Sequence, residues 1–553
     1  MFDVLVVGAG LGGLSAALKA RESGASVALI SKNAPFRSNS SMASGGINAA
    51  LGSIESDSPS LHAIDTLKSG AGLGEIETVK ILCEAAPSIA LELDALGAGF
   101  NRAENGKIAQ RSFGGSGKKR ACYVQDRTGA ALAQAALKAC NESGVKMLHG
   151  YFLLKLLIEN NRVVGVCALK NANSEVLAIG AKSVALAGGG YAGIYCGHTT
   201  NPLSSNGDTI AVAFRAGLRL VNMEFVQFHP TGLLGSGELV SEAARSEGGF
   251  LTFENGERFT DEMQTRDKLS RAIERETQSG RKVYIDARRL GKAFLESRLP
   301  NFCKAAAAKL GLDPSTDLIP IAPSAHYTMG GIEVDKSART AIKGLFACGE
   351  CAYNGVHGAN RMGGNSLLEA AVFGKIAGEN AAVFAKKAKA IAIDKIAQDT
   401  IAIEQKKIDR VIEGESRFNI NALQKSLGKK LIAKLGVFRD ANGLKDALEY
   451  AEYLQTLVGG LACVDKSRSN NVELTMILEF LNALEIAEVS ALAALRRKES
   501  RGAHFREDYP LSSDRFQKNS YVSRKSDGFY SVEFLQTRSL AWYIDKLRRA
   551  LSV

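Results

Sequence analysis

Short apolar runs and helix-spaced apolar positions alternate along the first 385 residues of the chain. Residues 2–7 (FDVLVV) predict a buried strand, and the spacing that follows predicts a helix to Ser23. A second strand is expected at 26–30, helices over most of 60–140, and a strand pair within 151–187. Strands and helices that alternate in this way indicate an α/β fold.

A glycine-rich loop between 349 and 364 joins a short apolar strand, at 345–347, to a helix. Asn365 and Ser366 are both good N-cap residues, so we expect the helix to begin there. Its positive N-terminal end then faces the loop, which suits an anion or an electron-rich ring. The alternative is an ordinary glycine-rich turn of an α/β protein.

The segment GAGLGG, at 8–13, separates the first strand from the first helix. A strand, GxGxxG and a helix in succession predict a dinucleotide site. Gly8 makes the tight turn, Gly10 lets the backbone approach a pyrophosphate, and Gly13 lets helix and strand pack closely. The second strand ends in Ser31-Lys32 instead of the usual acidic residue, and the fingerprint does not choose between FAD and NAD.

Two other segments differ in composition from a packed core. Residues 37–50 are small and polar, which is typical of a loop along an extended cofactor or, alternatively, of a flexible surface loop. Residues 223–324 supply many polar groups, as a cap over a buried site would. Beyond about Ala385 the chain becomes rich in lysine and alanine with helical periodicity.

The composition is that of a soluble globular protein with two to four structural units. The chain has 553 residues, of which 46% are apolar and 23% charged, and it contains no apolar run long enough to span a bilayer. No export signal is visible, so we expect a cytoplasmic protein. The nine cysteines form no disulfide framework or metal site, although Cys348 and Cys351 are close in sequence.

The net charge of +11 admits nucleic acid, a membrane surface or anionic substrates as partners. The lysines and arginines concentrate at 375–435 and in the last fifty residues, between apolar positions at helical spacing. We interpret them as solvated faces of surface helices, with a basic face toward an acidic partner as the alternative.

Several motifs together are similar to those of the fumarate reductase and succinate dehydrogenase flavoprotein subunits, with L-aspartate oxidase as a close relative. They are QRSFGG (110–115), MEFVQFHPTG (223–232), EAARSEGG (242–249), TRDKLS (265–270), HYTMGGIE (326–333), HGANRMGGNSLLE (357–369) and ESRGAHFREDYP (499–510). The resemblance implies an α/β Rossmann-like FAD-binding domain, at 1–224 and 326–385. It also implies an inserted α+β capping domain at 225–325, a C-terminal helical domain at 386–510 and a tail at 511–553.

The resemblance further assigns roles to individual residues. The dicarboxylate ligands fall on His229, Ser241, His326, Arg361 and Phe113, and the catalytic residues are the proton donor Arg266 with Glu242 and Arg245 as its proton relay. FAD ligands fall on Gly8, Gly10, Gly12, Gly13, Leu14, Ser31, Lys32, Asn39, Ser40, Gly45, Gly46, Asp208, Glu350, Arg361, Asn365, Ser366 and Leu367. No metal ligand is expected.

The chemistry is consistent with these roles. Two carboxylates need convergent donors, and the guanidinium of Arg361 offers a planar fork. An arginine is an unusual acid, because its free pKa exceeds about 12, and it can act only toward a carbanion in a dry site. Taken singly, Arg266 is better explained as a salt-bridge partner of Asp267 and each histidine as a core residue, but the joint spacing of these residues favours the catalytic roles.

Two departures from the family pattern change the expectation. Asn39 stands where respiratory members carry the histidine that bonds FAD covalently, so FAD is expected to bind non-covalently. In the family that bond raises the flavin potential enough to oxidise succinate, so its absence favours fumarate reduction or an oxidase activity. Ser241 replaces the substrate-binding threonine and retains the hydroxyl.

The leading hypothesis is a fumarate reductase or succinate dehydrogenase flavoprotein subunit that exchanges electrons with an iron–sulfur subunit. A membrane anchor subunit that holds it at the inner face of the cytoplasmic membrane is a further expected partner. The main alternative is L-aspartate oxidase, which also has non-covalent FAD but usually has Ala-Ser where this chain has Gly363-Gly364. A nucleic-acid-binding flavoprotein rests on the charge alone, and no nucleic acid partner is expected.

Overall fold

A twisted seven-stranded sheet forms the centre of the chain in the computed structural model, which describes residues 1–536. Its strand order is β6-β2-β1-β9-β8-β7, with β16 paired to β9. The bounds are β1 Phe2–Val7, β2 Val27–Ser31, β6 Lys146–His149, β7 Tyr151–Glu159, β8 Arg162–Lys170, β9 Glu175–Leu186 and β16 Leu345–Ala347. The parallel part, in which β1 pairs with β2 and β9, confirms the α/β expectation, whereas 151–187 holds three strands and not a pair.

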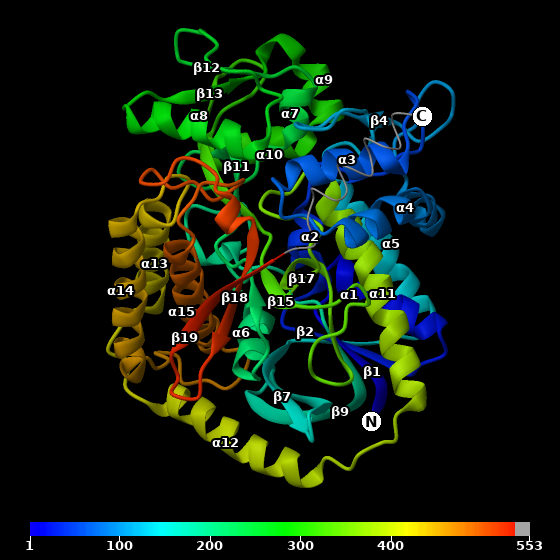
Figure 1. Ribbon diagram of the computed structural model, residues 1–553, viewed down its shortest axis with the longest axis vertical. Coiled ribbons are helices and arrows are strands. Elements are labelled where there is room, and N and C mark those ends of the chain that lie inside the picture. Colours follow the sequence, from blue (N-terminus) through cyan, green and yellow to red (C-terminus); the bar gives the residue numbers. More distant parts are fainter. Residues whose placement is uncertain (537–553) are drawn as a thin grey trace.

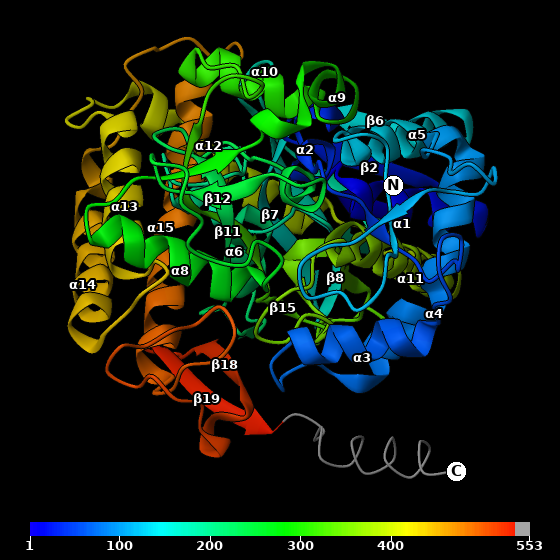
Figure 2. The ribbon, with the colours of Figure 1, turned by 90° about the horizontal axis from the view of Figure 1, so that it is seen from above.

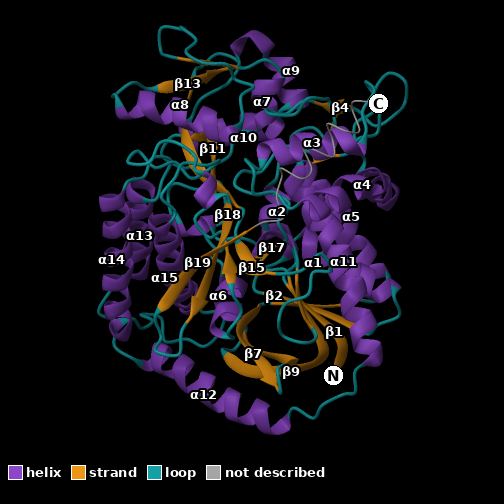
Figure 3. Ribbon diagram, viewed as in Figure 1, coloured by secondary structure: helices purple, strands orange, loops and turns teal. Residues whose placement is uncertain are grey.

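Five helices lie on one side of the parallel strands (Figures 1 and 3); the first and the last of them pack on the strands, and the other three pack against these helices or against one another. They are α1 Leu11–Glu22, α3 Pro59–Ser69, α4 Ile76–Leu93, α5 Thr128–Glu142 and α11 Asn365–Lys387. Helices α1 and α11 pack closely because glycines face the partner backbone: a Cβ on Gly378 would lie 2.1 Å from Ala16 O. This close contact holds the glycine-rich loop before α11 against the turn before α1.

The N-cap expectation for α11 is wrong. The cap position is Gly364, whose φ of +84° is a left-handed conformation that favours glycine, and no side chain caps the helix. Asn365 instead bonds across the fold, donating to Thr66 Oγ1 at 2.9 Å and accepting from Asn48 Nδ2 at 2.8 Å. Its side chain is therefore engaged in tertiary contacts, which local propensity does not include.

A second unit lies above the sheet at the top of Figure 1. It contains a four-stranded sheet of order β11-β14-β13-β12 and has its own apolar core, which includes Leu269 and Ile285. The elements are β11 Val226–Leu233, α7 Glu242–Ser246, β12 Phe250–Thr252, α8 Arg266–Gln278, β13 Val283–Asp286, α9 Lys292–Arg298, α10 Pro300–Leu310 and β14 Ile319–Thr328. We call this unit the cap.

Four further helices follow in the chain; the first, α12, runs below the main sheet in Figure 1, and the other three lie on the far side from α4 and α5, as Figures 1 and 2 both show. They are α12 Asp394–Glu413, α13 Ile420–Lys434, α14 Ala441–Leu457 and α15 Val472–Arg496. The segment expected as a tail holds the hairpin β18 Lys518–Arg524 and β19 Tyr530–Gln536. This hairpin joins a five-stranded sheet with β10 Leu220–Val221, β15 Gly331–Glu333 and β17 Ala352–Tyr353, while residues 537–553 of the expected tail lie outside the described residues.

Within residues 1–536, no helix has the length and apolarity that a bilayer crossing requires. The domain boundaries expected from the sequence stay predictions.

Candidate functional site

A long cavity opens at the carboxyl ends of β1 and β2, between the main sheet and the cap. Its lining includes 11 of the expected cofactor ligands, namely Gly8, Gly10, Gly12, Ser31, Lys32, Asn39, Ser40, Asp208, Glu350, Ser366 and Leu367. His326 and Tyr327 of β14 line it as well. The cavity therefore runs from the GxGxxG turn to the cap.

The turn after β1 fits the diphosphate of a dinucleotide. Gly8 has a φ of +118°, and a Cβ on it would lie 2.2 Å from Ala187 O, so only glycine is accommodated. Gly10 is the N-cap of α1 and has no side chain to cap it; the N–H of Leu11 donates to Ser40 Oγ at 3.1 Å, and Gly10, Gly12 and Ser40 all line this end of the cavity. Backbone donors at a helix N-terminus next to a cavity are the usual means of binding a pyrophosphate.

Lys32 is held by acidic side chains from distant parts of the chain. Its Nζ contacts Asp208 and donates to Glu479 Oε1 at 2.7 Å. Burial alone would lower the pKa of Lys32, but the two carboxylates outweigh it and raise the pKa. Asp208 thus brings a carboxylate to the end of β2, where the sequence has no acidic residue. Glu479, from α15, was not expected from the sequence.

Other expected cofactor ligands do not line the cavity. They are Gly13, Leu14, Gly45, Gly46, Arg361 and Asn365. Gly13 packs against the strand, since a Cβ there would lie 1.9 Å from Gly8 O, and Leu14 is fully buried in the apolar core. A contact of Leu14 with the cofactor stays a prediction.

Two histidines meet where the cavity reaches the cap. His229 of β11 and His326 of β14 lie on neighbouring strands, with ring centroids 5.0 Å apart. His326 Nδ1 is 2.7 Å from Thr200 Oγ1, and His229 Nδ1 is 3.2 Å from Thr231 Oγ1. Burial, and then the charge of Arg266, hold the pKa of both histidines well below the usual 6.5. Both rings are therefore uncharged at neutral pH.

Arg361 lies beside these histidines with an incomplete set of partners. Its guanidinium carbon is 4.4 Å from the centre of the Tyr327 ring, and its Nη2 donates to Gln227 Oε1 at 3.3 Å. Among residues 1–536, no group accepts a hydrogen bond from Arg361 Nε. Burial, and then the nearby charge of Arg266, lower the pKa of Arg361 to about 9. A buried guanidinium with an unused donor suits an anionic ligand.

Arg266, the first residue of α8, forms a buried ion pair with Glu242 of α7. Nη2 and Nε of Arg266 lie 2.7 and 3.1 Å from Glu242 Oε2. Glu242 Oε1 accepts from Gly114 N at 2.6 Å and is 3.9 Å from Arg245 Nη2. Burial alone would raise the pKa of Glu242, but Arg266 and Arg245 outweigh it and lower the pKa to about 2. The ion-pair partner of Arg266 is thus Glu242 and not its neighbour Asp267, which pairs with Arg271.

Ser241 and Phe113 occupy buried positions that do not line the cavity. Ser241 Oγ caps α7 by accepting from Ala243 N at 3.2 Å. The Phe113 ring packs against the chain at Gly45 and Gly363, where an added Cβ would lie 3.1 and 3.2 Å from its atoms. A role for Phe113 at a substrate stays a prediction.

Gln227 links the two arginines and was missed in the sequence. Its Oε1 accepts from Arg266 Nη1 at 3.2 Å as well as from Arg361. Gln227 lies two residues before His229 in one strand, and alternate residues of a strand share a face. That spacing was the signal that could have identified it.

Family models match nearly the whole chain. The model described as an FAD binding domain matches residues 3–367, and the one described as fumarate reductase flavoprotein C-term matches residues 424–543. The chain belongs to the succinate dehydrogenase and fumarate reductase flavoprotein family. It is therefore an FAD-dependent oxidoreductase, and the family expected from the sequence is confirmed.

Individual relatives agree with this assignment. A succinate dehydrogenase flavoprotein subunit of Rickettsia bellii is 36% identical over 93% of this chain and 91% of its own. The flavoprotein subunit of 8-methylmenaquinol:fumarate reductase from Wolinella succinogenes is 38% identical over 95% and 89%. A solved E. coli quinol fumarate reductase variant superposes with a TM-score of 0.92 at 33% identity, covering 97% of both chains. The fold class expected from the sequence is thereby confirmed.

Proposed function

We propose that this chain is the flavoprotein subunit of a fumarate reductase, and that it takes electrons from a separate iron–sulfur subunit and reduces fumarate to succinate. The observation that carries the proposal is the group of Arg361, two uncharged histidines and the Arg266–Glu242 pair beside the cofactor cavity. Cations and N–H donors that converge in a buried site suit a dicarboxylate.

The substrate carboxylates are bound by this group of residues. Arg361 donates from its unused Nε–H and from the terminal N–H groups of its guanidinium to one carboxylate. His229 and His326, whose Nδ1 atoms are occupied by threonine hydroxyls, keep Nε2 for the other. Ser241 adds a hydroxyl at the start of α7. Neutral histidines bind a carboxylate without adding to the charge near Arg266.

FAD, when it is bound and has been reduced by electrons from the iron–sulfur subunit, would supply the hydride for one alkene carbon of fumarate. Arg266 delivers a proton to the other carbon, so that hydride and proton together convert the CH=CH bond of fumarate to the CH2–CH2 bond of succinate. Glu242 contacts Arg266 and lies beside Arg245, and it therefore provides the path by which the proton on Arg266 is replaced. Glu242 is held ionised by its neighbours, which keeps it an acceptor for both guanidinium groups.

The direction of the reaction is inferred from Asn39. Its Nδ2 donates to Glu350 Oε2 at 3.4 Å, within the cofactor cavity. A carboxamide does not form the covalent flavin bond expected of a histidine in its place, and a non-covalent flavin favours reduction of fumarate over oxidation of succinate. The named relatives are subunits of larger enzymes, which supports an iron–sulfur partner and a peripheral position at the membrane.

L-aspartate oxidase is the second candidate, because it shares the non-covalent flavin that Asn39 implies. The two functions are separated by one experiment on the purified holoprotein. Reduced viologen dye should be oxidised when fumarate is added, with succinate as the product, and L-aspartate should not reduce the flavin. Reduction of the flavin by aspartate, without turnover of fumarate, would contradict the proposal.

A further inference from the structure

The loop between β4 Gln110–Arg111 and β5 Ala121–Cys122 belongs to the cofactor-binding part of the chain and contacts the cap. We call residues 112–120 the β4–β5 loop. Antiparallel pairing of Arg111 with Ala121 closes its base. At its tip, Gly114 N donates to Glu242 Oε1 at 2.6 Å. This backbone N–H is the contact that the loop makes with the proton relay.

The same tip supports the chain just before Arg266. A Cβ on Gly114 would lie 2.6 Å from Gln264 O, and a Cβ on Gly115 would lie 3.0 Å from Thr265 Cγ2. Glycines at these positions let the loop approach the cap backbone closely. The position of the loop therefore affects the positions of both the Glu242 carboxylate and the start of the helix that carries Arg266.

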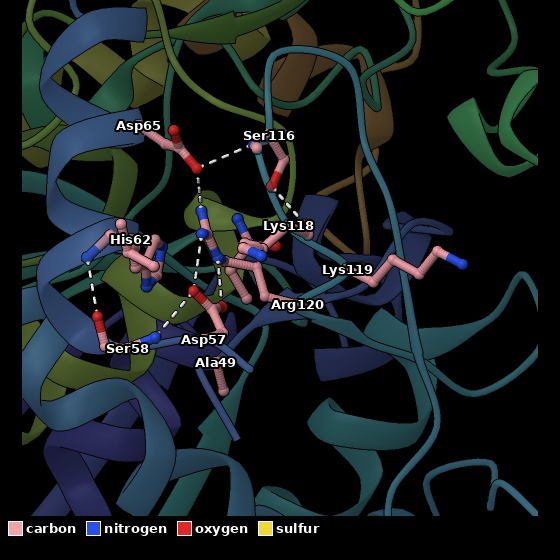
Figure 4. Close-up of polar contacts among 12 residues, drawn as sticks. Ala49, Asp57, Ser58, His62, Asp65, Ser116, Lys118, Lys119 and Arg120 are labelled. Carbon is pink, nitrogen blue, oxygen red and sulfur yellow. Dashed lines mark hydrogen bonds and ion pairs between the residues drawn. The ribbon is translucent and has the colours of Figure 1, made fainter. Parts of the chain in front are cut away.

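A buried charge cluster holds the base of the loop (Figure 4). Arg120 has no exposed surface, and its Nε and Nη2 donate to the two oxygens of Asp57 at 2.9 and 3.1 Å. Its Nη1 donates to Asp65 Oδ2 at 2.6 Å. Both acids come from the region of α3, so the cluster ties the loop to that helix.

Asp65 contacts both the middle and the C-terminal end of the loop. Its Oδ2 accepts from Gly117 N at 2.9 Å as well as from Arg120. Farther out, Glu55 accepts from Lys119 N at 2.6 Å and lies 3.6 Å from Lys118 Nζ. Apolar side chains of similar size stabilise a fold at least as well as buried ions, so the cluster is better explained by the geometry it imposes.

We propose that the Asp57–Arg120–Asp65 cluster positions the β4–β5 loop so that Gly114 N–H engages Glu242 and the loop tip supports the residues before Arg266. Asp65 and Arg120 are thus positioning residues for proton delivery to the substrate. The inference rests on the proposed function, in which Glu242 and Arg266 supply the proton.

Few other groups can replace the Gly114 contact. The charged groups that face Glu242 are Arg266 of α8 and Arg245 of α7, with Arg361 of the glycine-rich loop beyond them. Arg266 uses Glu242 Oε2, which leaves Gly114 as the donor within hydrogen-bond distance of Oε1. If the loop withdraws, the carboxylate turns toward Arg245 and away from the geometry shared with Arg266. A displacement of about 1 Å in such a site can lower a rate by up to ~100-fold.

The test uses Asp65→Asn in the full-length holoprotein, with Asp94→Asn as the matched control. Asp94 Oδ2 accepts from Arg102 Nη2 at 2.6 Å, the same distance as in the Asp65–Arg120 pair, and the two aspartates are 18% and 19% exposed. The control removes an ion pair of the same length outside the loop, although its arginine, Arg102, is 47% exposed whereas Arg120 is fully buried. Asp57→Asn is a second variant that weakens the cluster through its other acid.

Amide exchange, kinetics with malonate binding, and FAD content are measured for each protein. Amide hydrogen exchange of a peptide that spans 112–118 should be at least tenfold faster in Asp65→Asn and Asp57→Asn, and parental in Asp94→Asn. The kcat for fumarate should fall about tenfold with KM and the Kd for malonate within twofold, and the solvent deuterium isotope effect on kcat should rise. FAD content should remain parental, which a general loss of structure would not allow.

The outcomes separate this inference from the proposed function. Parental exchange in both variants overturns the inference, and so does faster exchange with parental kcat. A fall in kcat accompanied by an equal loss of FAD shows a structural cluster and also overturns it. If the parent protein does not turn over fumarate, the proposed function fails and with it the role in proton delivery, while the exchange result still decides whether the cluster holds the loop.

Discussion

Arg266 donates two hydrogen bonds to a single oxygen of Glu242, from Nη2 at 2.7 Å and from Nε at 3.1 Å. Both side chains are buried, so the pair is protected from water and from salt. Arg266 Nη1 remains directed to Gln227, which also contacts Arg361. The geometry therefore places the expected proton donor between its relay and the expected substrate clamp.

Removal of Arg266 should abolish turnover while binding is preserved. We expect Arg266→Ala to retain FAD and to bind malonate within about 1.4 kcal/mol of the parent, which is tenfold in affinity. Its rate of fumarate reduction should fall by several orders of magnitude, and Arg266→Lys should recover a small part because it keeps a cationic donor. Steady-state kinetics and malonate titration check this.

Arg271→Ala is the control for that experiment, since Arg271 lies on the same helix and pairs with Asp267 at 2.8 Å outside the site. It should keep most of the parental rate. Normal turnover by Arg266→Ala would remove Arg266 from the mechanism, and joint loss of malonate and FAD binding would make it a structural residue.

Arg361→Lys should weaken substrate binding. A lysine keeps one charge but loses the planar fork and the contact with the Tyr327 ring, which lies 4.4 Å from the guanidinium carbon. We expect KM for fumarate to rise at least tenfold and the binding of malonate to weaken to the same extent. Unaltered KM and malonate affinity would show that another group binds the carboxylate.

Glu369 should make the folded protein less stable as the pH rises. Burial raises the pKa of Glu369 to about 8, from an ordinary value of 4.5. Between these values the folded protein holds a proton that the unfolded chain has lost. Below about pH 4 the contribution of Glu369 to the free energy of unfolding is therefore complete. Above that pH the contribution falls by up to about 1.4 kcal/mol per pH unit, and it levels off above the folded pKa of about 8.

Glu369→Gln should remove this contribution, so the difference in urea midpoint between parent and variant should change from pH 5 to pH 8; His229 and His326, whose pKa values are lowered by burial, act in the opposite sense in both proteins and cancel in this difference. Glu350, whose pKa burial raises to about 7, contributes to the same decrease, so a residual slope is expected. Glu379→Gln, an exposed position of the same helix, should keep the parental slope. An equally steep slope in Glu369→Gln would contradict the assignment of a protonated Glu369.

FAD should be released when the protein is denatured. Asn39 offers a carboxamide where an imidazole would be needed for covalent attachment, and its Nδ2 is directed to Glu350. Acid precipitation of the holoprotein should leave all the flavin in the supernatant. A fluorescent flavin band that survives denaturing electrophoresis would refute the prediction.

The parts of the fold that the sequence predicts are those set by local pattern. The strand at 2–7, the GxGxxG turn and the helix after it depend on neighbouring residues, and Gly8 has the left-handed φ that the turn needs. The family motifs likewise identified His229 and His326, which meet on paired strands.

What the sequence does not predict depends on residues far apart in the chain. Lys32 and Glu479 are 447 positions apart, and no local pattern relates them. The N-cap expectation for Asn365 failed because its side chain is taken by Asn48, Thr66 and His62, each more than 290 positions away. The contact of Gly114 with Glu242 uses a backbone N–H, which leaves no sign in residue identity.

Single-turnover reoxidation of the reduced flavin tests the central claim most directly. The holoprotein is reduced anaerobically by one equivalent of dithionite per FAD and mixed with fumarate in a stopped-flow instrument. The account predicts rapid return of the oxidised flavin spectrum, one succinate per FAD, competition by malonate, and reoxidation slowed by several orders of magnitude in Arg266→Ala. Flavin that stays reduced in the presence of fumarate, or that reoxidises equally fast in the parent and in Arg266→Ala, would contradict it.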